Sequence, residues 1–324
     1  MENQPPSSRP GNEREWKLIE KLLGQAQEEH RKSRRWGIFF KILTFVYLFV
    51  LLFIMLPGKA GETMKVTEEH VGFVTVSGVI APDQDASADM IVTGLTRAFE
   101  AENTKAIVLK INSPGGSPVQ SNQVYNAIKR LRAEYPEKKV YAAITDLGAS
   151  GAYYIASAAD EIYADPASIV GSIGVIMAGF GFEEAAEKLG VERRVLTAGE
   201  NKAVMDPFSP ISPEDRKHMQ VMLDEIHQQF ITAVKNGRGD RLKADTHPEI
   251  FSGLFWTGEK AMELGLVDGL KSPGNVARDV VGLEEMVNYT VSRSPFEEFV
   301  RRFGVSIGEG VANKLGLSAA PEIR

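Results

Sequence analysis

Cysteine is absent from all 324 residues of the chain. Disulfide frameworks, zinc sites built on thiolates and cysteine nucleophiles are therefore excluded. Histidine is scarce as well, with five residues, and no His-Glu-x-x-His sequence of the kind that binds catalytic zinc occurs. The sequence predicts neither a metal site nor a bound cofactor.

Positive charge is also in short supply over most of the chain, whose net charge is −6. Residues 1–58 carry nine Lys and Arg against six Asp and Glu, whereas residues 59–324 carry 28 against 37. Proteins bind nucleic acids largely by placing Lys and Arg on the phosphates. The acidic main part therefore argues against a nucleic-acid partner.

One long apolar run lies near the N-terminus. Residues 36–56 read WGIFFKILTFVYLFVLLFIML, in which Lys41 is the one charged residue. At about 1.5 Å per helical residue the run is roughly 30 Å long, which matches the hydrocarbon core of a bilayer. A cleaved signal peptide is the rival interpretation, because Gly58 and Ala60 have the small side chains that a signal peptidase reads. The segment before the run is much longer than a usual n-region, so we expect a retained transmembrane anchor.

Charge on the two sides of this anchor predicts its direction. Residues 31–35 contain four Lys or Arg, whereas residues 57–69 mix two Lys with three Glu. The positive-inside rule then places the N-terminus in the cytoplasm and the rest of the chain outside. In a bacterium, we expect a single-pass protein of the inner (cytoplasmic) membrane whose main domain is periplasmic or otherwise extracytoplasmic.

These observations divide the chain into five parts. We expect a cytoplasmic segment at 1–35, the anchor at 36–56, a linker at 57–69, a main domain at 70–290 and a helical C-terminal tail at 291–324. The first dozen residues are polar and proline-rich, which is typical of disorder. The tail has an apolar stripe at helical spacing, which is typical of core or subunit packing.

Short apolar strands alternate with helices in the main domain. The pattern predicts strands at 71–76, 106–111, 140–144, 162–164 and 191–196, and helices at 87–102, 119–131 and 212–236. The last helix has a well-marked start, with Ser212 as N-cap and Pro213 in the first turn. Strands that alternate with helices form α/β folds with a largely parallel sheet, and the sites of such folds lie after the strands.

Two glycine-rich turns follow predicted strands. Residues 112–116 read NSPGG, and two glycines let backbone N–H groups point into a cleft, although the same residues also make an ordinary turn. Residues 148–152 read GASGA and place Ser150 between a strand and a helix among small side chains. Ser150 is therefore either an exposed nucleophile beside helix amides or a plain N-cap.

A nucleophilic serine needs a base, and the histidines suit that role badly. His30 precedes the anchor, His70 precedes the first strand, and His247 lies in a polar loop before a proline. His218 and His227 are nine residues apart on one predicted helix, so they face opposite sides. A triad that uses one of the last three histidines is open but has no support in the pattern.

Lys202 is the alternative base. It follows the predicted strand at 191–196 and is followed by Ala203, Val204 and Met205. Burial among apolar neighbours lowers the pKa of a lysine and lets it accept a proton near neutral pH. The ordinary interpretation is a solvated loop lysine.

Five segments together carry a family resemblance. They are NSPGG at 112–116, GASGAYYIA at 148–156, GSIGV at 171–175, the lysine segment at 197–205 and LFWTGEKAMELGLVDGL at 254–270. In this order they resemble the signal peptide peptidase A (SppA) family, which are serine peptidases of the Clp protease/crotonase superfamily. The chain is similar to the short, membrane-anchored members. The resemblance implies an α/β fold, the ββα superhelix of Clp protease and crotonase, preceded by one transmembrane helix.

The resemblance also implies roles for individual residues. Ser150 would be the nucleophile and Lys202 the general base of a Ser-Lys dyad. Gly116 and Gly151 would supply the amides of an oxyanion hole, and Ser172 would hydrogen-bond and orient the lysine. It further implies a homo-oligomeric ring or dome, with remnant signal peptides and other unfolded apolar peptides as substrates.

Three other functions stay open. A crotonase-type acyl-CoA enzyme shares the fold, but an extracytoplasmic domain is a poor match for a CoA substrate. An α/β-hydrolase esterase with a histidine base is the second, although GASGA ends in alanine where the Gly-x-Ser-x-Gly elbow has glycine. The third is an inactive membrane scaffold of the same fold, which would not need Ser150 and Lys202 to be intact.

Overall fold

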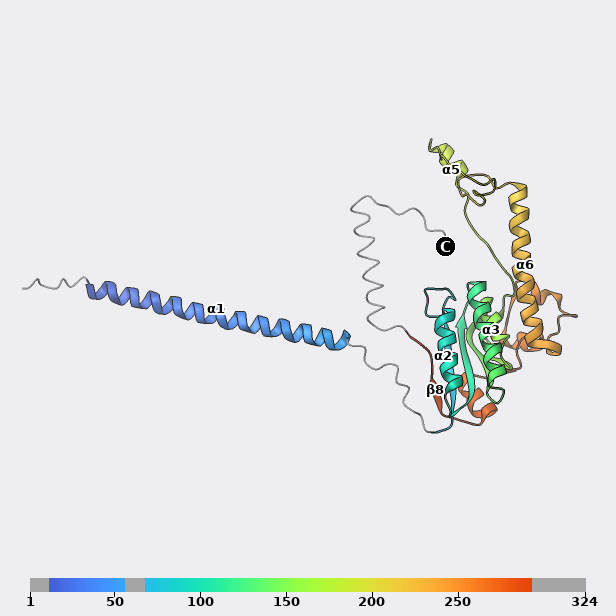
Figure 1. Cartoon of the computed structure of the whole chain (residues 1–324), viewed down its shortest axis with the longest axis horizontal. Coiled ribbons are helices and arrows are strands. Elements are labelled where there is room, and N and C mark those ends of the chain that lie inside the picture. Colours follow the sequence, from blue (N-terminus) through green and yellow to red (C-terminus); the bar gives the residue numbers. More distant parts are fainter. Residues whose placement is uncertain (1–11, 56–67, 293–324) are drawn as a thin grey trace, which may run out of the picture. The chain divides into compact units, whose positions relative to one another are not determined.

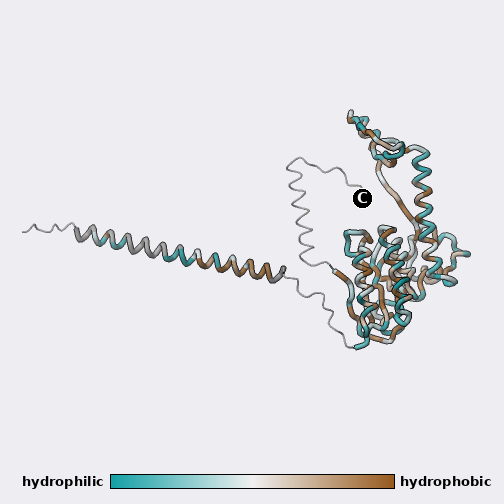
Figure 2. The backbone as a smooth tube through the Cα atoms, viewed as in Figure 1, coloured by the Kyte–Doolittle hydropathy of each residue, from teal (hydrophilic) through white to brown (hydrophobic). Residues whose placement is uncertain are grey.

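The computed structural model describes residues 12–55 and 68–292, and the chain divides into two units. The described part of the first unit is one helix, α1 (Asn12–Met55). Figure 2 shows apolar residues gathered in its second half, where the stretch Arg34–Leu52 is long and apolar enough to cross a membrane. The predicted anchor thus lies on a helix, while the crossing itself and its direction stay predictions. The predictions for residues 1–11, 56–67 and 293–324 lie outside the described residues.

The second unit is built on one sheet of eight strands. In chain order these are β1 (His70–Ser77), β2 (Thr104–Ser113), β3 (Lys139–Ala149), β4 (Glu161–Ala164), β5 (Ile169–Gly171), β6 (Phe255–Thr257), β7 (Gly269–Leu270) and β8 (Met286–Asn288). The strand order is β6-β5-β3-β2-β1-β8, and β4 joins β3 to β7. All pairs are parallel except β5 with β6. The predicted α/β class with a largely parallel sheet is confirmed.

Helices cover the sheet because its strands carry apolar residues on both faces. The helices of this second unit are α2 (Ala88–Glu100), α3 (Pro118–Glu134), α4 (Gly151–Ala156), α5 (Glu183–Lys188), α6 (Pro213–Arg238), α7 (Gly258–Glu263) and α8 (Pro273–Val276), of which α5 lies apart from the sheet, and short turns lie at Gly239–Arg241, Pro248–Phe251 and Ala277–Val281. In β2, Ile107 and Leu109 belong to the main core beneath α2, α3 and α4. The alternating residue Val108 points to a smaller core with Val276 of α8.

Strand β3 is longer than its sequence pattern predicts. Its first part pairs with β4 at residues 141–144, and its last part pairs with β5 at Leu147–Ala149. The predicted end of the strand at Ile144 is therefore wrong, since β3 continues to Ala149 and its last three residues pair with β5. The strand now ends directly before Ser150, and that residue lies at its carboxyl end.

Residues 175–212, which we call the extension, join Gly174 to α6 and contain α5. Figure 1 shows α5 apart from the sheet, beyond the N-terminal end of α6. The strand predicted at 191–196 is wrong, because this segment belongs to none of the strands of the described structure. A strand needs a partner edge for its backbone groups, and residues 191–196 pair with no strand among the described residues.

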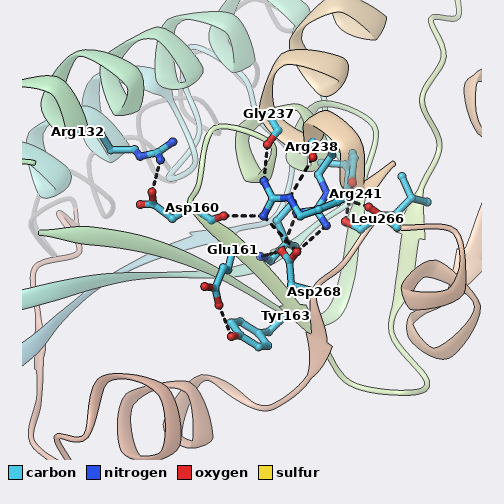
Figure 3. Close-up of polar contacts among 12 residues, drawn as sticks. Arg132, Asp160, Glu161, Tyr163, Gly237, Arg238, Arg241, Leu266 and Asp268 are labelled. Atoms are coloured by element: carbon cyan, nitrogen blue, oxygen red, sulfur yellow. Dashed lines mark hydrogen bonds and ion pairs between the residues drawn. The ribbon is translucent and has the colours of Figure 1, made fainter. Parts of the chain in front are cut away.

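A buried ion-pair network fixes the C-terminal end of α6 to the sheet (Figure 3). Arg238 is 2% exposed and makes two bonds to Asp268, Nη1 to Oδ2 at 2.6 Å and Nη2 to Oδ1 at 2.9 Å. Arg241 donates to the same carboxylate at 3.1 Å, and the Ile162 N–H of β4 donates to it at 2.7 Å. Asp268 therefore connects α6 with the strands that lie beside β3.

We expect Asp268→Asn to lower the free energy of unfolding by about 3 kcal/mol, because it leaves the buried Arg238 guanidinium without its charge partner. Urea unfolding of the full chain in detergent at pH 7 measures the change. Asp279→Asn, at a solvated ion pair with Lys271, is the matched control and should have little effect. Equal losses in both variants would contradict a special role for the buried pair.

The same carboxylate makes stability depend on pH. Burial alone would raise the pKa of Asp268, but hydrogen bonding and the charge of Arg238 outweigh it and hold that pKa below the ordinary value. The stabilisation is therefore complete above the ordinary carboxyl pKa of about 4 and is lost as pH falls through the lower native value. Asp268→Asn should remove this part of the acid sensitivity, which unfolding curves between pH 3 and 6 would show.

Candidate active site

Ser150 lies at a strained turn between β3 and α4. Its backbone has φ +53° and ψ −125°, a conformation that is costly for a residue with a side chain. Two bonds hold it there: Ser150 N–H donates to the Gly171 carbonyl at 2.8 Å, and Tyr154 N–H donates to the Ser150 carbonyl at 3.0 Å. Its hydroxyl makes no capping bond to α4 in the described structure. Ser150 thus occupies the N-cap position of α4 without capping it, and its role as nucleophile stays a prediction.

The glycines of NSPGG pack against this turn. A Cβ on Gly115 would lie 2.6 Å from the Gly151 nitrogen, and a Cβ on Gly116 would collide with the Ile80 carbonyl. Gly115 and Gly116 also have φ of +92° and +151°, which side chains disfavour. Both positions therefore require glycine for the loop to reach the serine turn.

Two backbone amides come close together beside Ser150. The Gly116 nitrogen lies 3.3 Å from where a Cβ of Gly151 would be. Gly151 is the first residue of α4, so its N–H has no partner within the helix. Within the described residues neither amide donates a hydrogen bond to another group. Two unpaired N–H groups beside a hydroxyl can bind an oxygen that becomes negatively charged.

Ser172 lies at the end of the neighbouring strand β5. It has the same φ of +53° as Ser150, and its N–H donates to the Leu254 carbonyl at 2.7 Å. It directly follows Gly171, whose carbonyl accepts the Ser150 N–H. The structure therefore places Ser172 next to the Ser150 turn, while its contact with a lysine stays a prediction.

Ser150 opens into a cavity of about 470 Å³. The cavity is mainly apolar, as expected for a site that takes uncharged side chains. Its walls come from the residues after NSPGG, from α4, from the start of the extension and from α6. The lining side chains and glycines are Gly116, Pro118, Val119, Asn122, Gln123, Ser150, Gly151, Tyr154, Gly174, Val175, Ile176, Ile226, Gln229 and Phe230. Sequence reasoning missed the α6 wall, although the i, i+4 spacing of Ile226 and Phe230 was a usable signal.

Lys202 is exposed, and it lies in the extension rather than in the cavity wall. Its backbone closes a turn with the Gly199 carbonyl at 3.2 Å. The following residues Ala203 and Met205 are exposed as well, so the apolar surroundings expected for this lysine do not form within one described chain. Its role as a base stays a prediction.

Four histidines of the main domain, His70, His218, His227 and His247, are bonded elsewhere or exposed. Buried His70 contacts the Tyr289 hydroxyl at 2.9 Å, and His247 contacts Glu249 at 2.9 Å. His227 contacts the Ile173 carbonyl at 3.0 Å, and His218 is exposed on α6. Among residues 12–55 and 68–292 no group of three His, Asp or Glu side chains could hold a metal ion.

Two family models match the chain, Peptidase family S49 over residues 132–285 and Clp protease over residues 74–168. A putative protease, slr0021 of Synechocystis, is 31% identical over 258 residues, which cover 78% of this chain and 90% of that protein. A putative signal peptide peptidase SppA of Enterococcus faecium is 30% identical over 204 residues, 60% of this chain and 58% of that protein.

A third relative is much longer than this chain. The Na(+)/H(+) antiporter NhaA of Brucella melitensis is 52% identical over 176 residues, which are 54% of this chain and 24% of that protein. The chain therefore spans about a quarter of the length of that relative, whose name describes the whole of the longer protein.

Proposed function

The chain belongs to peptidase family S49, as its resemblance to the SppA family predicts, and we propose that it is a membrane-anchored serine endopeptidase. The observation that carries the proposal is the unpaired Ser150 hydroxyl beside the free amides of Gly116 and Gly151, at the mouth of an apolar cavity. The peptidase domain would be residues 70–290, joined by a linker at 57–69 to an anchor at 36–56.

The chemistry follows from these groups. The Ser150 hydroxyl attacks the scissile carbonyl while a base takes its proton, and the amides of Gly116 and Gly151 stabilise the oxyanion. Collapse of the tetrahedral intermediate releases the amine half of the peptide, which takes up the proton, and leaves an ester on Ser150. A water molecule then hydrolyses this ester, with the same base taking the proton from water, and the serine is regenerated.

Lys202 is our proposed base, oriented by Ser172. A lysine accepts a proton in its neutral form, which water-excluding apolar surroundings favour. The exposed position of Lys202 on the extension suggests how such surroundings arise: the extension of one copy would reach the cavity of a neighbouring copy. The dyad would then combine Ser150 of one chain with Lys202 of the next.

The surface of the extension supports this arrangement. Large apolar side chains there are exposed to an unusual degree, among them Leu196 at 101%, Ile176 at 87% and Phe180 at 82%. Several large apolar side chains exposed in one segment are typical of a surface that contacts another protein. We propose that neighbouring copies cover it in a homo-oligomeric ring or dome, in which each active site is completed by a second chain.

The proposed substrates are unfolded apolar peptides near the membrane, including remnants of signal peptides. The apolar side chains of the cavity favour such peptides over charged ones. An anchor with a cytoplasmic N-terminus would hold the domain on the periplasmic side of a bacterial inner membrane, where such remnants are released. No metal or cofactor enters this chemistry.

The experiment is direct. The full chain is purified in detergent and incubated, in water enriched in ¹⁸O, with peptides that carry either an apolar or a charged residue at one position. The cleavage products are then identified by mass spectrometry. We expect internal cleavage after apolar residues, with one ¹⁸O in each new carboxylate. Cleavage of simple esters without any cleavage of peptides would favour an esterase, and no cleavage of either would favour a scaffold.

We expect Gly151→Ala to lower kcat by on the order of 100-fold, because displacement of one oxyanion amide has an effect of that size. The added methyl group would collide with the Ser121 hydroxyl, which packs against Gly151 from α3. The double variant Gly151→Ala with Ser121→Ala removes this collision, and the tightest contacts of the new methyl are then 3.3 Å to the Gly116 nitrogen and 3.5 Å to the Ser121 Cβ. It should therefore regain most of the lost kcat. A double variant as slow as Gly151→Ala alone would contradict this account of the oxyanion hole.

A further inference from the structure

His227 connects two walls of the cavity. It lies on α6, half-buried, and its Nε2 is 3.0 Å from the Ile173 carbonyl. A carbonyl oxygen only accepts hydrogen bonds, so Nε2 carries the hydrogen and donates it. The bond joins a helix to the loop after β5, 54 residues away along the chain.

The two partners of this bond have different tasks in the site. Ile173 is fully buried and lies between Ser172 and Gly174, where the extension begins. Gly174, Val175 and Ile176 form one wall of the cavity, whereas Ile226, Gln229 and Phe230 form the wall on α6. His227 is next to Ile226, and Ile173 is next to Gly174, so the bond links the residues that carry these two walls.

The helix that carries His227 is itself fixed. Its C-terminal end is joined to the sheet by Arg238 and Asp268, and Phe230 stacks on Tyr154 of α4 with ring centroids 4.9 Å apart. The loop at Ile173, in contrast, leads into the exposed extension. A rigid helix that donates to this loop can fix where the loop, and therefore the extension, leaves the domain.

We infer that His227 is a positioning residue: its Nε2–H bond to Ile173 sets the width of the substrate cavity and the direction of Ser172 and of the lysine-bearing extension. The inference rests on the proposed peptidase function. It differs from the histidine-base alternative, because here the ring acts as a hydrogen-bond donor to the Ile173 carbonyl and not as a proton acceptor in catalysis.

Replacement by glutamine separates the two roles. Glutamine places an amide N–H near the position of Nε2 but cannot act as a base. We expect His227→Ala to lower kcat/KM by on the order of 10- to 100-fold, the size of effect that small misplacements at a site produce. His227→Gln should restore the value to within about threefold of the parent, with the same pH profile. His218→Ala, on the exposed side of the same helix, is the matched control and should behave like the parent.

Hydrogen exchange gives a readout that does not need activity. Amides of residues 172–176 should exchange at least about tenfold faster in His227→Ala, because the loop loses its anchor, and they should return to the parental rate in His227→Gln. Unchanged exchange in His227→Ala would overturn the inference, whatever the activity. Restored exchange together with loss of activity in His227→Gln would overturn it in favour of a histidine base. Absence of Ser150-dependent cleavage in the parent would instead refute the proposed function.

Discussion

Ser150→Ala is expected to lower peptide cleavage by at least about 1000-fold, because without the hydroxyl no acyl-enzyme forms. The structure gives this residue a strained backbone, a hydroxyl without a capping bond and two unpaired amides beside it. The measurement is the initial rate of cleavage of a fluorogenic apolar peptide by the full chain in detergent.

Two controls make the result specific. Ser252→Ala removes an exposed hydroxyl that bonds to the Glu249 carbonyl at 2.7 Å and does not line the cavity, so it should cleave like the parent. The unfolding temperature of Ser150→Ala should match that of the parent, since alanine keeps the same Cβ on the same strained backbone and the lost hydroxyl makes no capping bond to α4. Cleavage that survives in Ser150→Ala would refute the proposed mechanism.

Lys202→Ala is expected to be as inactive as Ser150→Ala, although Lys202 lies on the exposed extension of the described chain. The physical reason is that a serine hydroxyl is a weak nucleophile until a base takes its proton. Lys188→Ala is a matched control, because this lysine lies on α5 in the same extension and pairs with Glu184 in solvent. It should keep parental activity.

Mixing the two inactive variants tests which chain supplies the lysine. If Ser150 and Lys202 of one site come from neighbouring copies, randomly co-assembled Ser150→Ala and Lys202→Ala chains restore about one quarter of the sites. The doubly substituted chain mixed with Lys202→Ala restores none, since no intact lysine is present. Parental activity of Lys202→Ala would refute the dyad. Two inactive variants that stay inactive after verified co-assembly would place both residues of the dyad in one chain.

Local sequence signals predicted much of the architecture. Helix α6 begins where Ser212 and Pro213 predict it, and the Ser212 hydroxyl accepts the Asp215 N–H at 3.0 Å. The strands β1, β2 and β4 lie on the predicted apolar runs. Ser150 was located because a serine among small residues between a strand and a helix is a local pattern.

The remaining features depend on contacts between distant parts of the chain. The extra length of β3 comes from its pairing with β5, and the bond between His227 and Ile173 joins residues 54 positions apart. The segment at 191–196 has the composition of a strand but pairs with no strand among residues 68–292. Its apolar residues indicate that the segment contacts another surface, but they do not identify that surface. The sequence therefore could not predict what surrounds Lys202, which follows this segment.

Covalent labelling tests the central claim most directly. The full chain is treated at neutral pH with a peptide phosphonate that reacts with activated serines and carries an apolar side chain, and the modified residue is mapped by tandem mass spectrometry. We predict one adduct, on Ser150, whose formation is lost in Lys202→Ala and retained in His227→Gln. An adduct on another residue, or equally fast labelling of Ser150 in Lys202→Ala, would contradict the account.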